Sequence, residues 1–157
     1  MEKLPAASLL MLSDFSMNRV HAANARLAGH ANVIAQKADI QDIPFSDGSF
    51  DFIIANHMLY HVPDINKGLS EVHRVLKKSG NFYCTTNGSE GMSKYLHNEL
   101  KVFNPSINAF DEGYISFSLQ NGREALGRYF DEIKMEAYID ALQITETQAL
   151  IDWIEST

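Results

Sequence analysis

The sequence has few of the features that mark several large protein classes. Its 157 residues include one cysteine, Cys84, so neither an internal disulfide nor a zinc site built from several cysteines can form. No apolar stretch approaches the roughly 20 residues of a membrane-spanning helix, and the apolar run near Met1 is too short for a signal peptide. We therefore expect a protein of a reducing compartment, the cytoplasm.

Positive charge is also scarce. The chain has 13 Lys and Arg against 20 Asp and Glu, a formal net charge of −7, and no basic run offsets it. This balance disfavours binding to a nucleic-acid backbone or to a membrane and favours a small-molecule partner. The 45% hydrophobic content is ordinary for a packed globular domain, and no linker or repeat divides the chain. We expect one domain over residues 1–157.

The spacing of apolar residues alternates between strand and helix patterns in the first half of the chain. Short apolar runs predict buried strands, whereas apolar residues three and four positions apart predict helices. The predicted order is strand 9–12, helix 16–28, strand 32–35, strand 50–55, helix 64–78 and strand 81–86. Helices that connect apolar strands indicate an α/β fold with a mainly parallel sheet.

The second half of the chain has less regular patterns. It predicts helix 92–103, a short strand 114–119, helix 122–130 and a half-buried strand 133–139. A last helix is expected to begin at Thr145, where Gln148 three residues on completes a capping box.

Polar residues stand just after the predicted strands, where open parallel sheets bind ligands. Asp14 follows the first strand and Asp39 the second, and such a pair of carboxylates suits a nucleoside, since one can accept from ribose hydroxyls and the other from an exocyclic amine. Two purely structural roles are equally compatible with position. Asp14 could cap the helix near Ser16, and Asp39 could close a turn.

Four segments occur in a fixed order along the chain: residues 12–16, 38–51, 54–62 and 69–82. Together they resemble the class I S-adenosylmethionine-dependent methyltransferases. Residues 12–16 resemble the end of that family's second strand, and 38–51 the connection before its fourth. Residues 54–62 are similar to the motif at the end of the fourth strand, and 69–82 to the helix-to-strand passage after it. The resemblance covers residues 9–87 and implies a Rossmann-like doubly wound fold with S-adenosylmethionine as cofactor.

The resemblance also implies roles for individual residues. Asp14 would hold the ribose hydroxyls, and Phe15 would flank the adenine. Asp39 would face the adenine amino group, and Ile40 would offer its backbone N–H and an apolar surface to the ring. The strand end at Asn56 and His57 would line the methionine and sulfonium region.

The sequence departs from the family at its start. The family begins with a strand, a glycine-rich turn and a helix, but only thirteen residues precede Asp14 and no G-x-G occurs. We expect an incomplete methyltransferase domain, with cofactor-side units in 1–87 and an acceptor-side segment in 88–157. The absent central strand would leave two apolar edges, which predicts direct re-pairing of the neighbouring strands or assembly into a homo-oligomer.

Other reactive groups are few. His57 and His61 are candidates for a general base, because an attacking oxygen or nitrogen must lose a proton. Their spacing does not match a metal motif, and no metal is expected. Cys84 lies in a predicted strand and is expected to be a buried small hydrophobe. The alternative to an enzyme acting on a small-molecule acceptor is a non-catalytic methyltransferase-like remnant that serves as a binding or oligomerisation module.

Overall fold

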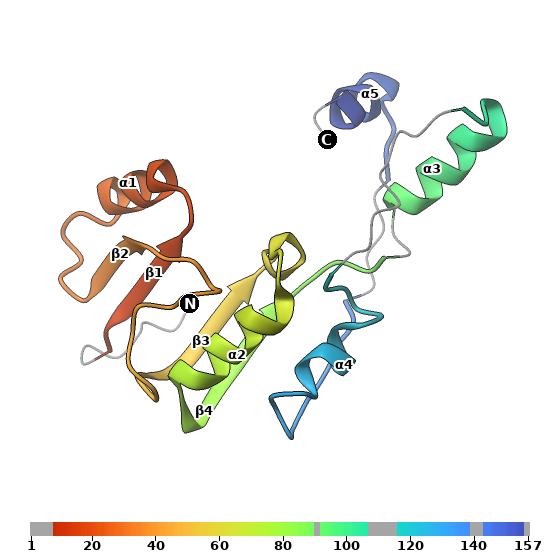
Figure 1. The fold of residues 1–157 in the computed structure, drawn as a ribbon. Helices are drawn as coiled ribbons and strands as arrows, with labels where there is room; N and C mark the ends of the chain where they lie inside the picture. The colour runs from red at the N-terminus through yellow and green to blue at the C-terminus, as the bar shows by residue number, and fades with distance from the viewer. Residues whose placement is uncertain (1–7, 90–91, 107–115, 139–142, 156–157) are drawn as a thin grey trace.

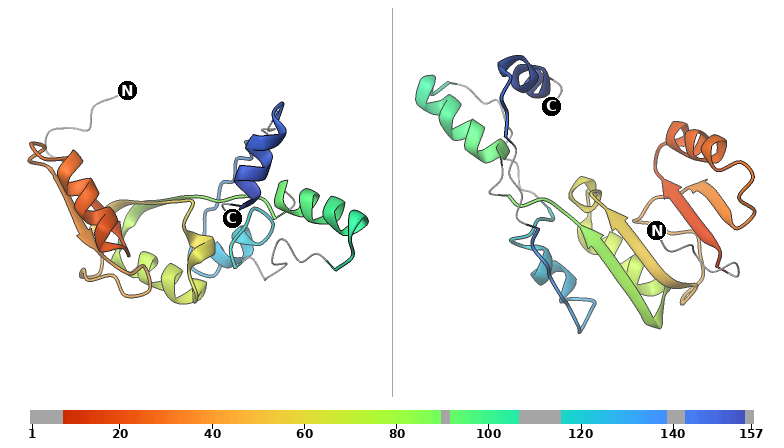
Figure 2. Two further views of the ribbon diagram at one scale, coloured as in Figure 1. Left: turned by 90° about the horizontal axis from the view of Figure 1, so that it is seen from above. Right: turned by 180° about the vertical axis from the view of Figure 1, so that it is seen from behind.

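A computed structural model of the chain describes residues 8–89, 92–106, 116–138 and 143–155. Figure 1 shows a βαβ unit on the left (β1, α1, β2), a second βαβ unit in the centre and further helices beyond it, and Figure 2 shows the same arrangement from two other sides. In chain order the elements are β1 (Leu10–Asp14), α1 (Met17–Arg26), β2 (Val33–Lys37), β3 (Phe50–Asn56), the short 3-10 helix η1 (Leu59–His61), α2 (Ile65–Val75), β4 (Leu76–Thr85), α3 (Met92–Phe103), α4 (Gly122–Leu126) and α5 (Thr147–Glu155).

The strands form two parallel pairs, which confirms the predicted α/β class. β1 pairs with β2, with Leu12 opposite Ala35, and β3 pairs with β4, with Ile53 opposite Phe82. The strands of both pairs run in the same sense, so their carboxyl ends point to one side of the molecule (Figure 1). The strand ends therefore share one edge, as ligand binding in an open α/β sheet requires.

The predicted direct re-pairing across the middle of the sheet is wrong. Among the described residues β1 is hydrogen-bonded only to β2, and β3 only to β4. The connection 38–49 between the pairs is hydrogen-bonded to α2, so β3 is placed by α2 and β4 rather than by β1. Two strand edges are thus left without a ladder, and their assembly with another chain remains a prediction.

Helix α1 begins and ends close to the predicted positions. Ser16 is its N-cap residue with extended backbone angles, and the Ser16 N–H donates to Asp14 Oδ1 at 2.8 Å. Val20 is the buried residue of this helix, packed on the β1–β2 pair. The chain turns back through Gly29, whose φ of 99° favours glycine because a Cβ would be strained there.

The main core lies between α2, β3 and the segment after α3. Leu59 and Leu69 are fully buried and contact the buried ring of Phe117 within one hydrophobic cluster. Gly68 lets α2 approach its neighbours, since a Cβ at this position would lie 3.3 Å from Val62 Cγ1 and 3.5 Å from Ile40 Cγ2. Ile40 is thereby held against α2 just beyond the end of β2.

The boundary between α2 and β4 differs from the prediction. The helix ends at Val75, and residues 76–78, predicted as its last turn, belong to β4. Phe50 is paired with Leu76 in the ladder, so strand pairing takes over these residues. At the other end of the helix Asp64 is the N-cap residue, and its carboxylate accepts from the Lys67 N–H at 3.0 Å.

The two faces of the β3–β4 pair differ in exposure. Phe82 and Cys84 pack against the core, and burial raises the pKa of the Cys84 thiol, which confirms the expected apolar role. Phe52, Ile54 and Tyr83 point to the opposite face and are 61%, 65% and 55% exposed. The Phe52 and Tyr83 rings stack on that face with centroids 6.4 Å apart.

Three predictions for the second half of the chain are wrong in their described parts. Residues 116–119 are not a strand, and 114–115 lie outside the described residues. The predicted helix 122–130 is the five-residue α4 followed by a turn. Residues 133–138 have no strand structure, because their alternating apolar pattern finds no partner strand within the described chain, and residue 139 lies outside it.

The last helix begins at Thr147 rather than Thr145, so the predicted capping box is wrong. The Gln148 side chain instead reaches along the helix and donates from Nε2 to Asp152 Oδ1 at 2.7 Å. Such a contact four residues apart stabilises the helix surface rather than its start.

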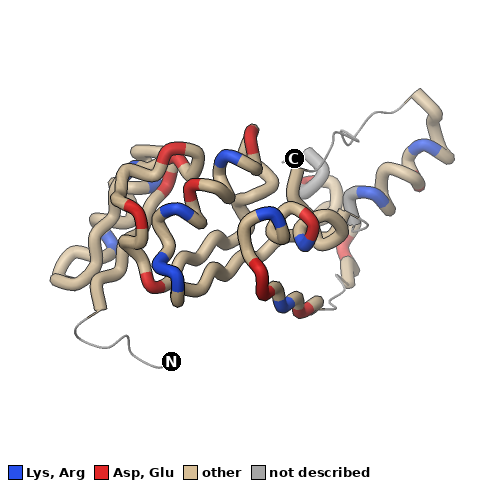
Figure 3. The backbone as a smooth tube through the Cα atoms, turned by 60° about the horizontal axis from the view of Figure 1, so that its bottom comes forward, with Lys and Arg blue, Asp and Glu red and all other residues tan. Residues whose placement is uncertain are grey.

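Charge is spread over the molecule. Lys and Arg occur on most elements, with Asp and Glu interspersed (Figure 3). Within the described ranges the model contains no helix of the length and apolar character needed to cross a membrane.

Candidate functional site

Asp14 stands at the last position of β1, where the strand meets α1. Its Oδ1 accepts from the Ser16 N–H at 2.8 Å, and its Oδ2 lies 3.6 Å from Arg19 Nη1. The Asp14 side chain is 36% exposed, and the Arg19 side chain is 80% exposed. The helix-capping alternative is therefore present in the geometry, and Oδ2 keeps most of its capacity to accept from a ligand, because an ion pair of this length and exposure is weak.

Asp39 is brought beside Asp14 by the backbone. The Ala38 N–H donates to the Asp14 carbonyl at 3.3 Å, so Asp39 directly follows this hydrogen bond, two residues beyond Lys37 at the end of β2. The turn alternative is present here too, since Asp39 Oδ1 accepts from the Gln41 N–H at 2.9 Å. Two carboxylates thus stand at adjacent strand ends, as the sequence predicts.

Phe15 and Ile40 flank this pair in different ways. Phe15 is 68% exposed, and Lys37 Nζ lies 5.0 Å from the centroid of its ring, within the range of a cation–π contact. The Ile40 side chain packs against Gly68 of α2, whereas its N–H donates no hydrogen bond within the part of the chain that the structure describes. An exposed ring and an unpaired N–H are the groups that a planar heterocycle could use.

Asn56 and His57 end the third strand. Asn56 is opposite Thr85 in the ladder, and the His57 N–H donates to both the carbonyl and Oγ1 of Thr85, each at 3.1 Å. His57 has a φ of 46°, a left-handed conformation that turns the chain sharply out of the strand. His61 follows in η1 with its ring 4.4 Å from that of Tyr60. The His57 and His61 side chains are exposed.

The structure gathers the predicted residues into two groups. Asp14 and Asp39 belong to the β1–β2 pair, and Asn56 and His57 to the β3–β4 pair. No hydrogen bond or ion pair links the two groups among the described residues. In the same residues no three His, Cys, Asp or Glu side chains gather in a way that could hold a metal ion.

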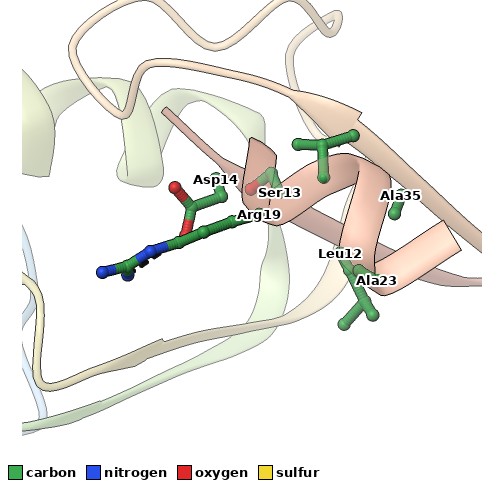
Figure 4. Close-up of a pocket in the computed structure, with 7 residues that line it drawn as sticks. Leu12, Ser13, Asp14, Arg19, Ala23 and Ala35 are labelled. Atoms are coloured by element: carbon green, nitrogen blue, oxygen red, sulfur yellow. Dashed lines mark ion pairs between the residues drawn. The ribbon is translucent and has the colours of Figure 1, made fainter. Parts of the chain in front are cut away.

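A small pocket opens beside Asp14. It lies between α1 and the β1–β2 pair and has a volume of about 130 Å³. Figure 4 shows Asp14 and Arg19 side by side at one end and Leu12 and Ala23 at the other. Pockets for cofactor-sized ligands usually enclose about 300–1,000 Å³, so this one could take only part of a nucleoside.

A network of side chains that the sequence prediction missed holds residues 41–47 on α2. Arg74 uses all five guanidinium donors: two go to Glu71, two to the carbonyls of Ile43 and Phe45, and one to Asp47, at 2.7 to 2.9 Å. Glu71 Oε2 also accepts from the Ile43 N–H at 2.9 Å. Glu71 and Arg74 are three apart on one helix, which is a signal for an ion pair but not for the contacts of this pair 27 to 31 positions away.

The Arg74 hydrogen bonds lower the pKa of Glu71 to about 2, despite the opposing effect of burial. The same pairing raises the pKa of Arg74. The connection that carries Asp39 and Ile40 is therefore attached to a helix by a charged clamp, defined as Glu71, Arg74 and Asp47.

The parallel strand pairs, with polar side chains at their carboxyl ends, define an α/β domain of the class that binds ligands beyond the strand ends. Comparison with known proteins makes this specific. The family model described as "Methyltransferase domain" matches residues 3–84, and the chain belongs to that family. The resemblance to class I S-adenosylmethionine-dependent methyltransferases is thereby confirmed.

Curated relatives share part of this chain. A demethylmenaquinone methyltransferase of Staphylococcus epidermidis is 37% identical over 71 residues, which are 45% of this chain and 30% of the relative. A ubiquinone/menaquinone biosynthesis C-methyltransferase of Rickettsia prowazekii is 38% identical over 78 residues, 48% of this chain and 32% of the relative. The alignments thus span about a third of the length of these relatives.

Solved structures show the same fold. The YcgJ protein of Bacillus subtilis aligns with a TM-score of 0.58 and 23% identity, over 78% of this chain and 52% of that one. A solved complex between the Haloferax volcanii Trm112 methyltransferase activator and a putative methyltransferase also aligns, with a TM-score of 0.57 and 25% identity. The alignment covers 76% of this chain and 49% of that one. These likenesses confirm the Rossmann-like fold class.

Proposed function

We propose that this chain forms the adenosine-facing part of a site for S-adenosylmethionine and takes part in methyl transfer to a small molecule. The observation that carries the proposal is the Ala38–Asp14 backbone hydrogen bond, which places two carboxylate-bearing residues side by side at the carboxyl edge of the strands. Membership of the methyltransferase domain family supports the same cofactor.

The residues present suit an adenosine. Asp14 Oδ2 can accept from ribose hydroxyls, and the exposed Phe15 ring can cover one face of the adenine. Asp39 can accept from the exocyclic amine while the unpaired Ile40 N–H donates to a ring nitrogen. The bound cofactor supplies an activated methyl group on a sulfonium sulfur.

We assign the methionine and sulfonium end of the cofactor to the β3–β4 pair. Asn56 and His57 would line the methionine and sulfonium region, and His57 or His61 would take the proton that an attacking oxygen or nitrogen must lose. Both histidines are exposed and follow β3 at the shared edge of the strands, which supports this placement. Proximity and orientation alone also accelerate such a transfer.

We propose that these 157 residues carry only part of the cofactor site. The pocket beside Asp14 has a volume of about 130 Å³, and the sequence holds no G-x-G turn that could approach the methionine carboxylate. We assign residues 1–87 to the cofactor side and 88–157 to the acceptor side of a single domain. The names of the relatives refer to quinones, but this chain aligns with only about a third of those proteins. We therefore propose a small-molecule acceptor without naming its class.

We also propose that the protein is cytoplasmic. It is supported by a single cysteine, Cys84, whose thiol is half-buried in the core and has a raised pKa. Such a thiol suits a reducing compartment, because it neither needs nor readily forms a disulfide.

Calorimetric titration with S-adenosylhomocysteine tests the proposed site. We expect the wild-type chain to bind it through its adenosine end and Asp14→Ala to bind roughly tenfold or more weakly, because hydrogen bonds to a charged acceptor are lost. Asp131→Ala, an exposed aspartate distant in sequence from the strand ends, is the matched control and should bind like wild type. Unchanged affinity of Asp14→Ala would remove Asp14 from the site.

A second candidate function is oligomerisation as a non-catalytic module, and the edges of β1 and β3 that have no partner strand within the described residues favour it. We expect light scattering to give a mass above the monomer value of 17.6 kDa for wild type. Ile54→Lys on β3 should move the mass toward the monomer, because a lysine on an open strand opposes further pairing. Val102→Lys on α3, 84% exposed, is the control. A wild-type chain that is monomeric at all concentrations would exclude this candidate.

A further inference from the structure

Gln41 makes four hydrogen bonds that join the Asp39 carboxylate to the start of α2. Its backbone N–H donates to Asp39 Oδ1 at 2.9 Å, and its Nε2 lies 3.3 Å from Oδ1 and 3.5 Å from Oδ2 of the same carboxylate. Its Oε1 accepts from the backbone N–H of Asp64, the N-cap residue of α2, at 3.0 Å. Both ends of the Gln41 amide are therefore engaged.

Gln41 is attached to a helix that is itself well packed. Asp64 caps α2, whose residues Leu69, Val72 and Val75 are fully buried. The charged clamp of Glu71, Arg74 and Asp47 holds the chain on the other side of Gln41 at Ile43 and Phe45. Gln41 is thus secured on both sides by contacts with one rigid helix.

Among the described residues, Gln41 is the residue whose hydrogen bonds reach the Asp39 carboxylate. Its two shorter contacts are both to Oδ1, which leaves Oδ2 with a single long contact of 3.5 Å. A carboxylate held in this way has one oxygen fixed and the other open to a donor. The amide also completes its own hydrogen bonding through Asp64, so its orientation is set by partners on both sides.

We propose that Gln41 is a positioning residue that orients Asp39 toward the exocyclic amine of the cofactor's adenine. The inference rests on the proposed function and adds a specificity determinant to it. An amine donates to the open Oδ2, whereas a carbonyl oxygen at the same place on the purine would face an acceptor and be repelled. Without the Gln41 side chain the carboxylate is held only by the backbone N–H, and this discrimination would weaken.

The test compares binding of S-adenosylhomocysteine with binding of S-inosylhomocysteine, in which an oxo group replaces the amine. Calorimetry on wild type should show tighter binding of the amine form. In Gln41→Met the side chain keeps its volume but loses the Nε2 contacts to Asp39 and the Oε1 contact to Asp64, whereas the backbone N–H to Asp39 Oδ1 remains. The dissociation constant of S-inosylhomocysteine divided by that of S-adenosylhomocysteine should then fall by roughly threefold to tenfold. Gln41→Glu should lower this ratio as well, since its side chain lacks the Nε2 donor to Asp39. Gln143→Met, at an exposed position, should leave the ratio unchanged.

The ratio is independent of the fraction of folded protein, so a destabilised variant still gives an answer. A Gln41→Met variant that keeps the wild-type ratio would overturn the positioning role while leaving the cofactor site intact. Wild type that binds neither compound would overturn the proposed function and the positioning role together. Equal wild-type affinity for the two compounds would overturn the role of Asp39 toward the amine, and with it that of Gln41.

Discussion

Replacing Phe117 by alanine is expected to lower the free energy of unfolding by about 3–5 kcal/mol, the range for deleting a buried phenylalanine ring. Phe117 is 2% exposed and packs in one cluster with Leu59 and Leu69. Its ring lies on Gly122, where an added Cβ would be 3.1 Å from Phe117 Cζ. The cavity left by the truncation cannot close easily, because it lies next to the helices α2 and α4, whose backbones would have to move to fill it.

The substitution should also release residues 116–130 from the central unit. The Phe117 carbonyl accepts from Thr86 Oγ1, just after β4, at 3.1 Å, and Phe130 packs on Phe82 of β4. Phe117 is a fully buried side chain of this segment, so its loss should loosen the contacts around it. Urea unfolding followed by circular dichroism measures the loss, and hydrogen exchange of residues 116–130 locates it. Phe103→Ala, with the side chain 87% exposed, is the matched control. Equal stability of the two variants would show that Phe117 is not the link.

The order of elements over residues 10–85 is predictable from sequence because each element carries its own periodicity. The strand at Phe50 and the helix after Asp64 alternate or repeat their apolar residues in patterns that few other structures share. Leu76 shows where such reasoning fails. It continues the apolar stripe of α2, yet the ladder with Phe50 takes it into β4, and strand pairing is a property of two distant segments.

The predicted strand 133–139 fails for a related reason. The alternation of Ile133, Met135 and Ala137 describes a ribbon with one apolar face, but a strand also needs a neighbour for its N–H and C=O groups. Within the described chain residues 133–138 have none. Local pattern predicts which conformation a segment could adopt, whereas tertiary partners decide whether it does.

The candidate site divides in the same way. Asp14 and Asp39 are predictable because a polar residue at the end of an apolar strand is a local feature, and the structure brings them together through Ala38. The roles of Gln41, Glu71 and Arg74 could not be predicted from the sequence. Their contacts with the connection or with α2 join residues that are 23 to 31 positions apart. These residues hold the site in place without carrying a motif of their own.

Acidification is expected to weaken the fold through Glu71. Its pKa is lowered from the ordinary value of 4.5 to about 2, chiefly by the hydrogen bonds from Arg74 and further by the Ile43 N–H. Because the folded-state pKa lies below the unfolded one, the stabilisation is fully present above about pH 4.5 and is lost as the pH falls toward 2. Protonation removes acceptors from Arg74 and loosens residues 43–47, which lead back to Asp39.

Glu71→Gln should reproduce the acid form at neutral pH. We expect the free energy of unfolding at pH 7 to fall by about 1.5–3 kcal/mol, the range for hydrogen bonds to a charged group, because the Glu71 side chain is only 19% exposed. The difference between wild type and variant should shrink as the pH is lowered from 4.5 toward 2, since both then carry an uncharged side chain at this position. Urea unfolding at several pH values measures it.

A control variant separates the effect of Glu71 from the general effect of acid on the fold. Glu124→Gln supplies the control: Glu124 pairs with Arg128 at 3.3 Å on the surface of α4, and its side chain is 81% exposed. Exposed pairs of this kind contribute about 0–1 kcal/mol, so its stability should follow wild type at every pH. If the gap between wild type and Glu71→Gln stayed constant through the acid range, the ion pair with Arg74 would not be its source.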